Sequence, residues 1–154
     1  MRQDISIRIG KERDMETLIR FNIEIARETE ARELPLDVVS AGVRALLSNP
    51  QYGFYVVAEK DDVVVGSLMV TTEWSDWRNG VFWWIQSVYV RPEFRRQGIY
   101  RKLYEYVKAR AIEQSNVCGF RLYVERENVV AQKAYQALGM KETRYKMYEE
   151  LLQH

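Results

Sequence analysis

The chain has 154 residues, of which 47% are hydrophobic and 29% charged, and its formal net charge at pH 7 is +1. This size and composition are typical of a globular domain with a proper core and exclude a long disordered segment. A net charge near zero provides no overall field that would attract nucleic acid. We therefore expect residues 1–154 to form a single domain that binds no nucleic acid.

Cysteine, histidine and long apolar runs are scarce. Cys118 is the only cysteine, so an internal disulfide cannot form and a reducing cytoplasm is the expected location. The first ten residues lack the apolar core of a signal peptide, and no apolar run approaches membrane-spanning length, so no membrane association is expected.

The only histidine is His154. Histidine-based nucleophiles, bases and metal sites are therefore disfavoured, and we expect no metal.

The first half of the chain predicts a strand, two helices and a hairpin. Ile5–Ile9 alternates apolar and polar residues, and residues 14–31 place apolar residues at helical spacing. Pro35 opens a second helix, which Asn49-Pro50 ends. Residues 52–74 then predict two strands joined by a tight turn at Lys60–Asp62.

The next segment predicts a parallel strand–helix–strand unit. Residues 81–90 (VFWWIQSVYV) follow a turn and are so continuously apolar that they predict a central strand covered on both faces. A helix begins near Gly98, and residues 119–125 (GFRLYVE) predict the next strand, which such a crossover makes parallel to the first.

The end of the chain predicts one more helix and one more strand. Residues 128–138 have helical periodicity, and Gly139 is placed to cap that helix. Residues 144–150 alternate as a last strand would. The whole pattern predicts an α/β fold with a mixed sheet, antiparallel first and parallel later, flanked by about four helices.

Residues 91–100 (RPEFRRQGIY) place two adjacent arginines where a helix begins, although a helix N-terminus is already partly positive. The segment follows the carboxyl end of a strand, where open α/β sheets bind ligands and free N–H groups hold phosphate oxygens. Arg95 and Arg96 suit a pyrophosphate, and Gly98 allows its close approach. A single glycine excludes the dinucleotide fingerprint, and no Walker A motif is present. The alternative is a solvated arginine pair.

The segment VRPEFRRQGIYRKLYEYV resembles the acetyl-CoA-binding motif, [QR]-x-x-G-x-[GA], of the GNAT family of N-acetyltransferases. The segment NVVAQKAYQALGM is similar to the family's N-x-x-A-x-x-x-Y-x-x-x-G-[FM] pattern. The resemblance covers about residues 53 to 148 and implies a GNAT-like fold. In that fold residues 81–140 would bind acetyl-CoA and the helices within 14–48 would face the acceptor. The matching positions are Arg95, Arg96, Gln97, Gly98, Ile99 and Tyr100, then Asn128, Ala131, Tyr135, Gly139 and Met140.

The resemblance also implies roles for individual residues. The backbone of Val88, Tyr89 and Val90 would pair with the pantetheine arm like an added strand, and the amides of Arg96–Arg101 would hold the pyrophosphate. Asn128 would hydrogen-bond the cofactor arm, and Tyr135 would lie beside the thioester sulfur. A homodimer, which is common in the family, is also implied.

Tyr135 is the expected general acid for the departing thiolate, because no histidine competes for that role. The alternative is an aromatic packing residue on an apolar helix face. Two positions depart from the family pattern. Tyr100 stands where the family has Gly or Ala, and its phenol must point away from the cofactor or stack on it. Gln86 stands where many members have a glutamate base, and glutamine cannot accept a proton.

The acceptor end is indicated by residues 71–80 (TTEWSDWRNG), where carboxylates and indoles suit a small cationic amine. With Gln86 unable to act, Glu73 or Asp76 is the expected base, and bulk water is the alternative. A regular strand would give two faces, Glu73 with Trp77 and Trp74 with Asp76. Glu28 and Glu30, near the connection between the first two helices, would add negative charge. The alternative is a solvated turn with tryptophans covering the sheet edge.

Two other functions remain open. The basic residues of 91–102 and the aromatic residues could form a nucleic-acid-binding surface, against which the near-zero net charge argues. Gln86 and Tyr100 could instead indicate an acyl-CoA sensor or interaction domain that keeps the fold without the catalysis.

Overall fold

The computed structural model describes residues 4–153, which fall into two compact units divided between Tyr123 and Val124. The described part of the first unit holds a sheet in the order β1-β2-β3-β4-β5 and three α-helices, and the second unit holds one α-helix. This mixed sheet with four helices is the fold class that the sequence predicts. No helix of the described residues is long and apolar enough to cross a membrane.

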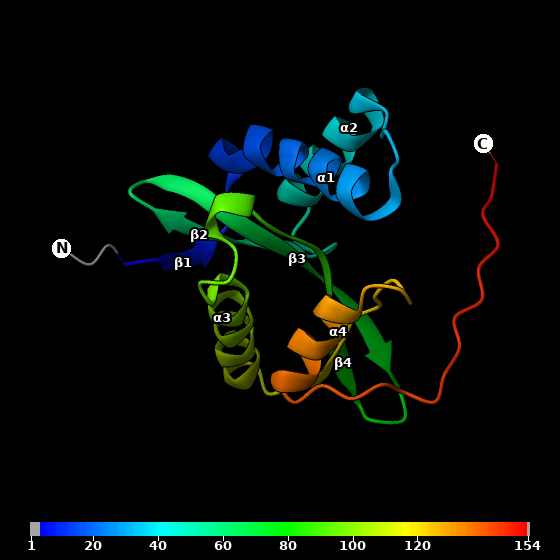
Figure 1. Cartoon of the computed structure of the whole chain (residues 1–154). Coiled ribbons are helices and arrows are strands. Elements are labelled where there is room, and N and C mark those ends of the chain that lie inside the picture. The colour runs from blue at the N-terminus through cyan, green and yellow to red at the C-terminus, as the bar shows by residue number, and fades with distance from the viewer. Residues whose placement is uncertain (1–3, 154) are drawn as a thin grey trace. The chain divides into compact units, whose positions relative to one another are not determined.

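The sheet is antiparallel through its first four strands and parallel at its last pair, as expected (Figure 1). Its strands are β1 (Ser6–Ile9), β2 (Phe54–Lys60), β3 (Val63–Ser75), β4 (Gly80–Val90) and β5 (Val117–Arg121). The helices of the first unit are α1 (Met15–Glu30), α2 (Leu36–Ser48) and α3 (Ile99–Glu113). Short 3-10 turns precede α1 (Glu12–Asp14, η1) and follow β4 (Pro92–Phe94, η2).

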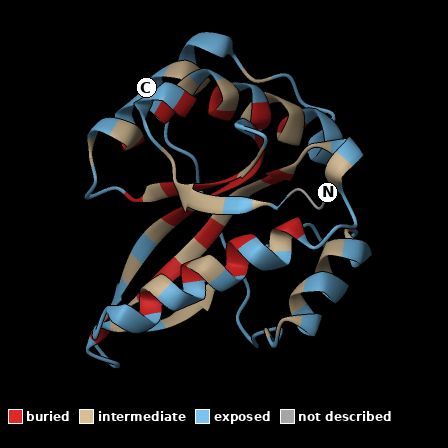
Figure 2. Ribbon diagram, turned by 90° about the vertical axis from the view of Figure 1, so that its left-hand side faces the viewer, coloured by how far each residue is buried: buried red, intermediate tan, exposed pale blue. Residues whose placement is uncertain are grey.

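Helices cover both faces of the first unit's sheet (Figure 1). On one face α1 and α2 pack on the sheet, with the rings of Phe21 and Tyr89 4.7 Å apart. On the other face α3 turns a buried stripe toward the sheet, in which Leu103 and Val107 are fully buried (Figure 2). The helical spacing of these apolar residues is what makes each helix amphipathic and lets it bury one face.

A buried ion-pair network fixes the start of α1 to the sheet edge. Arg8 on β1 donates two hydrogen bonds to Asp14 and a third to Glu59 on β2. Burial alone would raise the pKa of Asp14, but bonds from Arg8 and from the backbone N–H of Lys11 hold that pKa below its ordinary value. The network therefore depends on an ionised Asp14.

β4 is an inner strand rather than one covered continuously on both faces. Only some of its residues are buried, and Trp84 and Gln86 are partly exposed. The reason is that α1 packs against Tyr89 near the carboxyl end of β4 and does not bury the middle of that face. This partly open face belongs to the candidate site described below.

Two predicted strands differ in the structure. β5 runs over Val117–Arg121 instead of residues 119–125, because its pairing with β4 begins at Val81 and ends at Trp84. Residues 144–150 form no strand, although they alternate, and Tyr145 and Met147 are exposed. Alternation sets which side chains share a face, but a strand also needs a partner, and no described strand pairs with this segment.

The second unit contains α4 (Val129–Ala137). Asn128 caps it, because its side-chain oxygen accepts the backbone N–H of Ala131 at 3.1 Å. Gly139, with φ of +96°, follows the helix in the left-handed conformation expected of its cap.

Candidate functional site

The middle and end of β4 present an unpaired backbone edge. β5 pairs with β4 only over Val81–Trp84, so Ile85–Val90 have no strand partner on that side among the described residues. We call this stretch the open edge. It includes Val88, Tyr89 and Val90, the residues expected to pair with a pantetheine arm. An extended ligand with amide groups fits such an edge, as a strand would.

A β-bulge interrupts the open edge. Between the pairs Ser67–Tyr89 and Met69–Gln86, β4 has two residues, Ser87 and Val88, where β3 has one. Ser87 takes a left-handed backbone with φ of +51°, which is unusual for a residue other than glycine. Bulges redirect side chains and are frequent beside active sites. The sequence analysis missed this feature, for which the apolar run gives no signal.

The loop after η2 gathers backbone N–H groups without acceptors. Arg96 and Gly98 are both left-handed, with φ of +65° and +76°. Within residues 4–153 no oxygen accepts the backbone N–H of Arg96, Gln97, Gly98, Ile99 or Arg101. These amides lie at the N-terminus of α3, where the helix dipole adds positive potential. We call Arg95–Gly98 the arginine loop, and its backbone fits a phosphate group.

The two arginines of this loop have different surroundings. Arg95 donates Nε to the carbonyl of Val90 at 2.8 Å and Nη2 to both carboxylate oxygens of Glu28. Two adjacent arginines at a helix start call for a negative charge nearby, and Glu28 on α1 supplies part of it. No described oxygen accepts a hydrogen bond from the side chains of Arg96 and Arg101, which are exposed. Those two cations are available to a ligand.

Tyr100 directs its ring along α3. Its centroid lies 6.4 Å from that of Tyr104, which is buried. The Tyr100 ring therefore contacts a buried ring of the same helix.

The candidate residues of the second unit are Asn128 and Tyr135. The oxygen of Asn128 is engaged in the helix cap, which leaves its amide N–H groups as donors. Tyr135 is half-buried on α4, and burial raises the pKa of its phenol. A phenol with a raised pKa keeps its proton at neutral pH.

One face of the sheet carries polar side chains near the bulge. Gln86 donates Nε2 to Thr71 Oγ1 at 2.6 Å. Farther along the same face, Trp84 donates Nε1 to Glu73 at 2.7 Å, and Arg121 donates to both oxygens of Glu73 at 3.1 Å. Despite some desolvation, the bond from Trp84 and the charge of Arg121 lower the pKa of Glu73. Glu73 is therefore a charge partner and a weak base. We call this region the acceptor face.

The expected pairing of carboxylates and indoles on a regular strand is wrong. β3 ends at Ser75, so Asp76 and Trp77 lie in the turn, and Trp74 points away from Glu73 because alternate residues face opposite sides. Trp77 is 90% exposed. Ser87, at the bulge, lies seven positions after Gly80, a span of about 23 Å along the strand. Asp76 lies beyond Gly80, which argues against its acting near the bulge.

Arg121 is the acceptor-face residue that the sequence analysis missed. Its guanidinium lies 3.8 Å from the centroid of Phe82 as well as against Glu73. A cation within a predicted strand, GFRLYVE, was the available signal, but its carboxylate partner lies 48 residues away in the chain. Glu30, at the end of α1, is exposed, and no described residue bonds its side chain.

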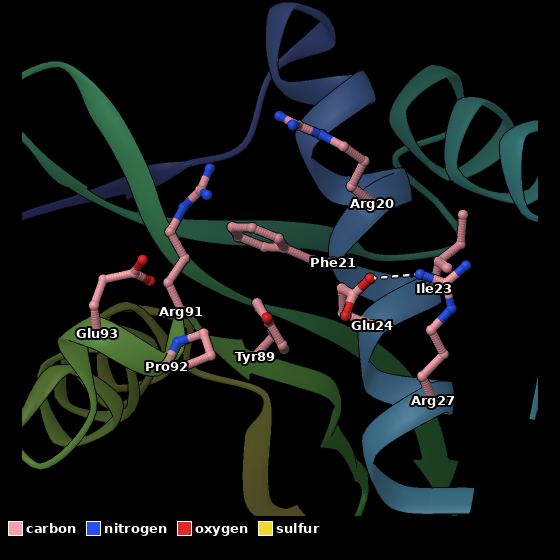
Figure 3. Close-up of a pocket in the computed structure, with 9 residues that line it drawn as sticks. All are labelled: Arg20, Phe21, Ile23, Glu24, Arg27, Tyr89, Arg91, Pro92 and Glu93. Atoms are coloured by element: carbon pink, nitrogen blue, oxygen red, sulfur yellow. Dashed lines mark hydrogen bonds and ion pairs between the residues drawn. The ribbon is translucent and has the colours of Figure 1, made fainter. Parts of the chain in front are cut away.

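A separate pocket of about 450 Å³ opens between α1 and η2 (Figure 3). Phe21 and Tyr89 contribute apolar surface, and the cations Arg20 and Arg91 extend toward the same opening. Arg27 pairs with Glu24 at its other side. We call this cavity the α1 pocket.

Comparison with known proteins identifies the family of this chain. The model of the acetyltransferase (GNAT) family matches residues 15–140. The crystal structure of a possible acetyltransferase from Clostridium difficile 630 is 47% identical, with a TM-score of 0.91, and the match covers 97% of this chain and 99% of that one. No curated protein matches the sequence.

More distant solved structures share the fold. An aminoglycoside N-acetyltransferase in complex with CoA is 19% identical, with a TM-score of 0.76 over 98% of this chain and 97% of that one. A ribosomal-protein-alanine N-acetyltransferase from Brucella melitensis biovar Abortus 2308 is 17% identical, with a TM-score of 0.79 over 97% of this chain and 100% of that one.

Proposed function

Because the chain belongs to the GNAT family of acetyltransferases, we propose that it moves the acetyl group of acetyl-CoA to a primary amine, and that this acceptor is a small cationic amine. One observation carries the proposal. The open edge, Ile85–Val90, is followed after η2 by a loop in which the backbone amides of Arg96, Gln97 and Gly98 have no acceptor among the described residues. This arrangement suits a co-substrate that has an amide-containing arm followed by a pyrophosphate.

Each part of that surface has a separate task. The open edge would hold the arm by backbone hydrogen bonds, and the amides from Arg96 to Arg101 would hold the phosphates, with the side chains of Arg96 and Arg101 adding charge. Asn128 would donate its free amide N–H groups to the arm. Acetyl-CoA supplies an activated thioester, so the protein has only to align it with an amine.

Tyr135 is proposed as the general acid for the leaving thiolate. The raised pKa of its phenol keeps a proton available throughout the neutral range. A positioned acid of this kind contributes about a hundredfold or more to a rate.

The proton of the incoming ammonium needs another acceptor. Deprotonating an alkylammonium at pH 7 costs about 4 kcal/mol, which is small beside a typical enzymatic barrier reduction. Gln86 cannot accept the proton, and the lowered pKa of Glu73 makes that carboxylate a weak base. We therefore propose that water on the acceptor face takes the proton, and that Glu73 stabilises the cation before it is lost.

The preference for a cationic acceptor rests on Glu73 and its aromatic neighbours. The side chain of Glu73 is 42% exposed, so a ligand can reach it although Arg121 is bound. The rings of Trp84 and Tyr123 lie beside each other, with centroids 6.1 Å apart, and Tyr123 is exposed. A carboxylate next to aromatic faces suits an organic cation.

The test is acetyl-CoA turnover, followed as thiol release, against polyamines, aminoglycosides, amino acids and peptide N-termini. We expect turnover with at least one amine and a preference for polyamine-like or aminoglycoside-like acceptors. Turnover that favours acidic or uncharged amines would overturn the acceptor class and leave the reaction in place.

The second candidate is an acyl-CoA sensor without significant catalysis. It is favoured by one observation, namely that neither Gln86 nor the paired Glu73 is an effective proton acceptor. CoA binding without turnover of any amine in the panel would establish this alternative.

A further inference from the structure

We propose that the α1 pocket binds a small organic monocarboxylate with a flat apolar body, at a site separate from the acetyl-CoA surface. The pocket lies between α1 and the segment from Tyr89 to Glu93, and all of its lining residues belong to the first unit. The inference does not rest on acetyl transfer, because all lining residues of the pocket except Tyr89 lie outside the surface that the proposed reaction uses.

Arg91 is the preorganised cation of the pocket. Its backbone N–H bonds the carbonyl of Val65 and its Nε bonds the carbonyl of Val64, both at 2.9 Å. The guanidinium is thereby held 5.2 Å from the ring centroid of Phe21. No described oxygen accepts a hydrogen bond from its two terminal nitrogens. A guanidinium fixed through Nε with both terminal nitrogens available matches the two oxygens of a carboxylate.

A second cation faces the same opening. Figure 3 shows the side chain of Arg20 extending from α1 above Phe21, toward the side where Arg91 ends. The only oxygen that Arg20 meets among the described residues is the hydroxyl of Thr17, at the limiting distance of 3.5 Å. Two guanidinium groups without a carboxylate partner therefore border one space, which favours an anion.

The remaining charges limit the anion to a single negative charge. Arg27 pairs with Glu24 at 2.8 Å and also with Glu33, which lies outside the pocket lining. Counted over the lining residues, three arginines (Arg20, Arg27 and Arg91) and two glutamates (Glu24 and Glu93) leave an excess of one positive charge. A second negative charge on the ligand would meet the carboxylate of Glu93. This selects a monocarboxylate over inorganic phosphate or a dicarboxylate.

The apolar lining and the volume of the pocket indicate the size and polarity of the ligand's body. Phe21 and Tyr89 are both buried, and the guanidinium groups of Arg91 and Arg95 lie over their rings, so these two rings contribute little accessible surface to the pocket. Ile23 and Pro92 add apolar wall. A volume of about 450 Å³ lies within the usual range for small-molecule sites. An aromatic or planar acyl carboxylate can lie against Ile23 and Pro92 while its carboxylate meets the two arginines.

The experiment is a titration of the full chain with benzoate, followed by calorimetry and by backbone amide chemical shifts. Benzamide, the neutral isostere, and inorganic phosphate are the comparison probes. We expect saturable benzoate binding at millimolar concentration, weaker binding of phosphate and none of benzamide. The shifts should change mainly within residues 20–27 and 89–93. Equal binding of benzoate and benzamide, or shifts elsewhere, would overturn the proposal.

Single-residue variants distinguish binding in the pocket from attraction by the general surface charge. Arg91→Gln should weaken benzoate by about tenfold or more, as expected for a lost bond to a charged group, and Arg20→Gln should weaken it less. Arg44→Gln, at an exposed arginine on α2, is the matched control and should change nothing. Arg91→Lys keeps the charge but loses the Nε anchor, and it should also bind more weakly. Equal affinity in Arg91→Gln and Arg44→Gln, at unchanged melting temperatures, would contradict the assignment.

Benzoate binding in the presence of coenzyme A tests whether this site is distinct from the co-substrate surface. Saturating coenzyme A should leave benzoate binding in place, because the open edge and the arginine loop contribute only Tyr89 to the pocket. Competitive loss of benzoate would show that the pocket belongs to the co-substrate site and would overturn the inference. A chain that bound benzoate but not coenzyme A would instead contradict the proposed function alone.

Discussion

At the scale of single residues, the proton on Tyr135 is the first point to test. Tyr135→Phe keeps the ring and removes only the hydroxyl, so kcat should fall by about ten- to a thousandfold, as for the loss of one general acid. Coenzyme A affinity should change little. Single-turnover rates of acetyl transfer are the measurement, because they report the chemical step. Tyr52→Phe, at an exposed tyrosine before β2, is the control. An unchanged single-turnover rate would return Tyr135 to the packing residues.

Glu73 should affect acceptor binding rather than chemistry. Glu73→Gln removes the charge but keeps an oxygen for Trp84 and Arg121. The KM for a cationic amine should rise by about two- to fivefold, the range of a partly exposed ion pair. The KM for acetyl-CoA should stay unchanged. Initial rates at varied amine concentration provide the measurement.

Asp76→Asn is the matched control for this prediction, since Asp76 lies in the turn beyond β3. It should leave the amine KM unchanged. A large loss of kcat in Glu73→Gln would mean that Glu73 accepts the proton after all. Equal effects of both variants would mean that the charge of the whole hairpin, rather than the acceptor face, attracts the amine.

At the scale of elements, helices and hairpins follow from local periodicity, while the site depends on contacts between distant residues. The spacing of Leu103 and Val107 alone predicts the buried face of α3. By contrast, Glu28 meets Arg95 across 67 residues. The bulge at Ser87 arises because β3 and β4 differ by one residue between two pairs. Periodicity within one segment carries no information on either feature, so sequence reasoning placed the arginine loop but not its partner.

The lack of information on distant contacts also explains why the strand predicted at residues 144–150 is wrong. Its alternation is a local property, whereas strand formation needs backbone groups of a neighbour, and no described strand supplies them. The motif residues of the arginine loop were predictable for the opposite reason. Their proposed function depends on backbone amides at a helix start, which sequence position alone determines.

The junction of β1, η1 and α1 gives a prediction on stability. Asp14→Asn should lower the free energy of unfolding at pH 7 by about 2–3 kcal/mol, somewhat less than for a fully buried pair, because Arg8 keeps contact with solvent. Since the pKa of Asp14 is lowered by folding, its contribution is fully present above its unfolded-state pKa and disappears as the pH falls through its folded-state pKa.

The advantage of the wild type over Asp14→Asn should therefore shrink below about pH 4. Urea unfolding at pH 7 and at pH 3 measures both values. Glu105→Gln, at an exposed carboxylate of α3, is the control and should differ little from wild type at either pH. A difference that persisted unchanged at pH 3 would mean that Asp14 acts through packing rather than through its charge.

At the scale of the whole molecule, binding of the co-substrate should stabilise the folded chain, because only that state presents the arginine loop. Coenzyme A at a hundred times its Kd should add about 2.7 kcal/mol, which corresponds to a rise in melting temperature of about 5–10 °C for a chain of this size. Gly98→Val should abolish the rise. Valine is strained at φ of +76°, and its side chain would project into space that is open within 4 Å and lies beside the amides proposed to bind phosphate.

Gly139→Val is the control that distinguishes the effect of backbone strain from the effect of a lost binding surface. Gly139 has φ of +96°, and a Cβ there also meets nothing within 4 Å, so both variants should lower the melting temperature of the free protein. Only Gly98→Val should remove the response to coenzyme A, since Gly139 lies after α4 and outside the arginine loop. Thermal unfolding of the three proteins with and without coenzyme A is the measurement. If wild type shows no rise at millimolar coenzyme A, or if the two variants respond equally, the loop does not hold the pyrophosphate.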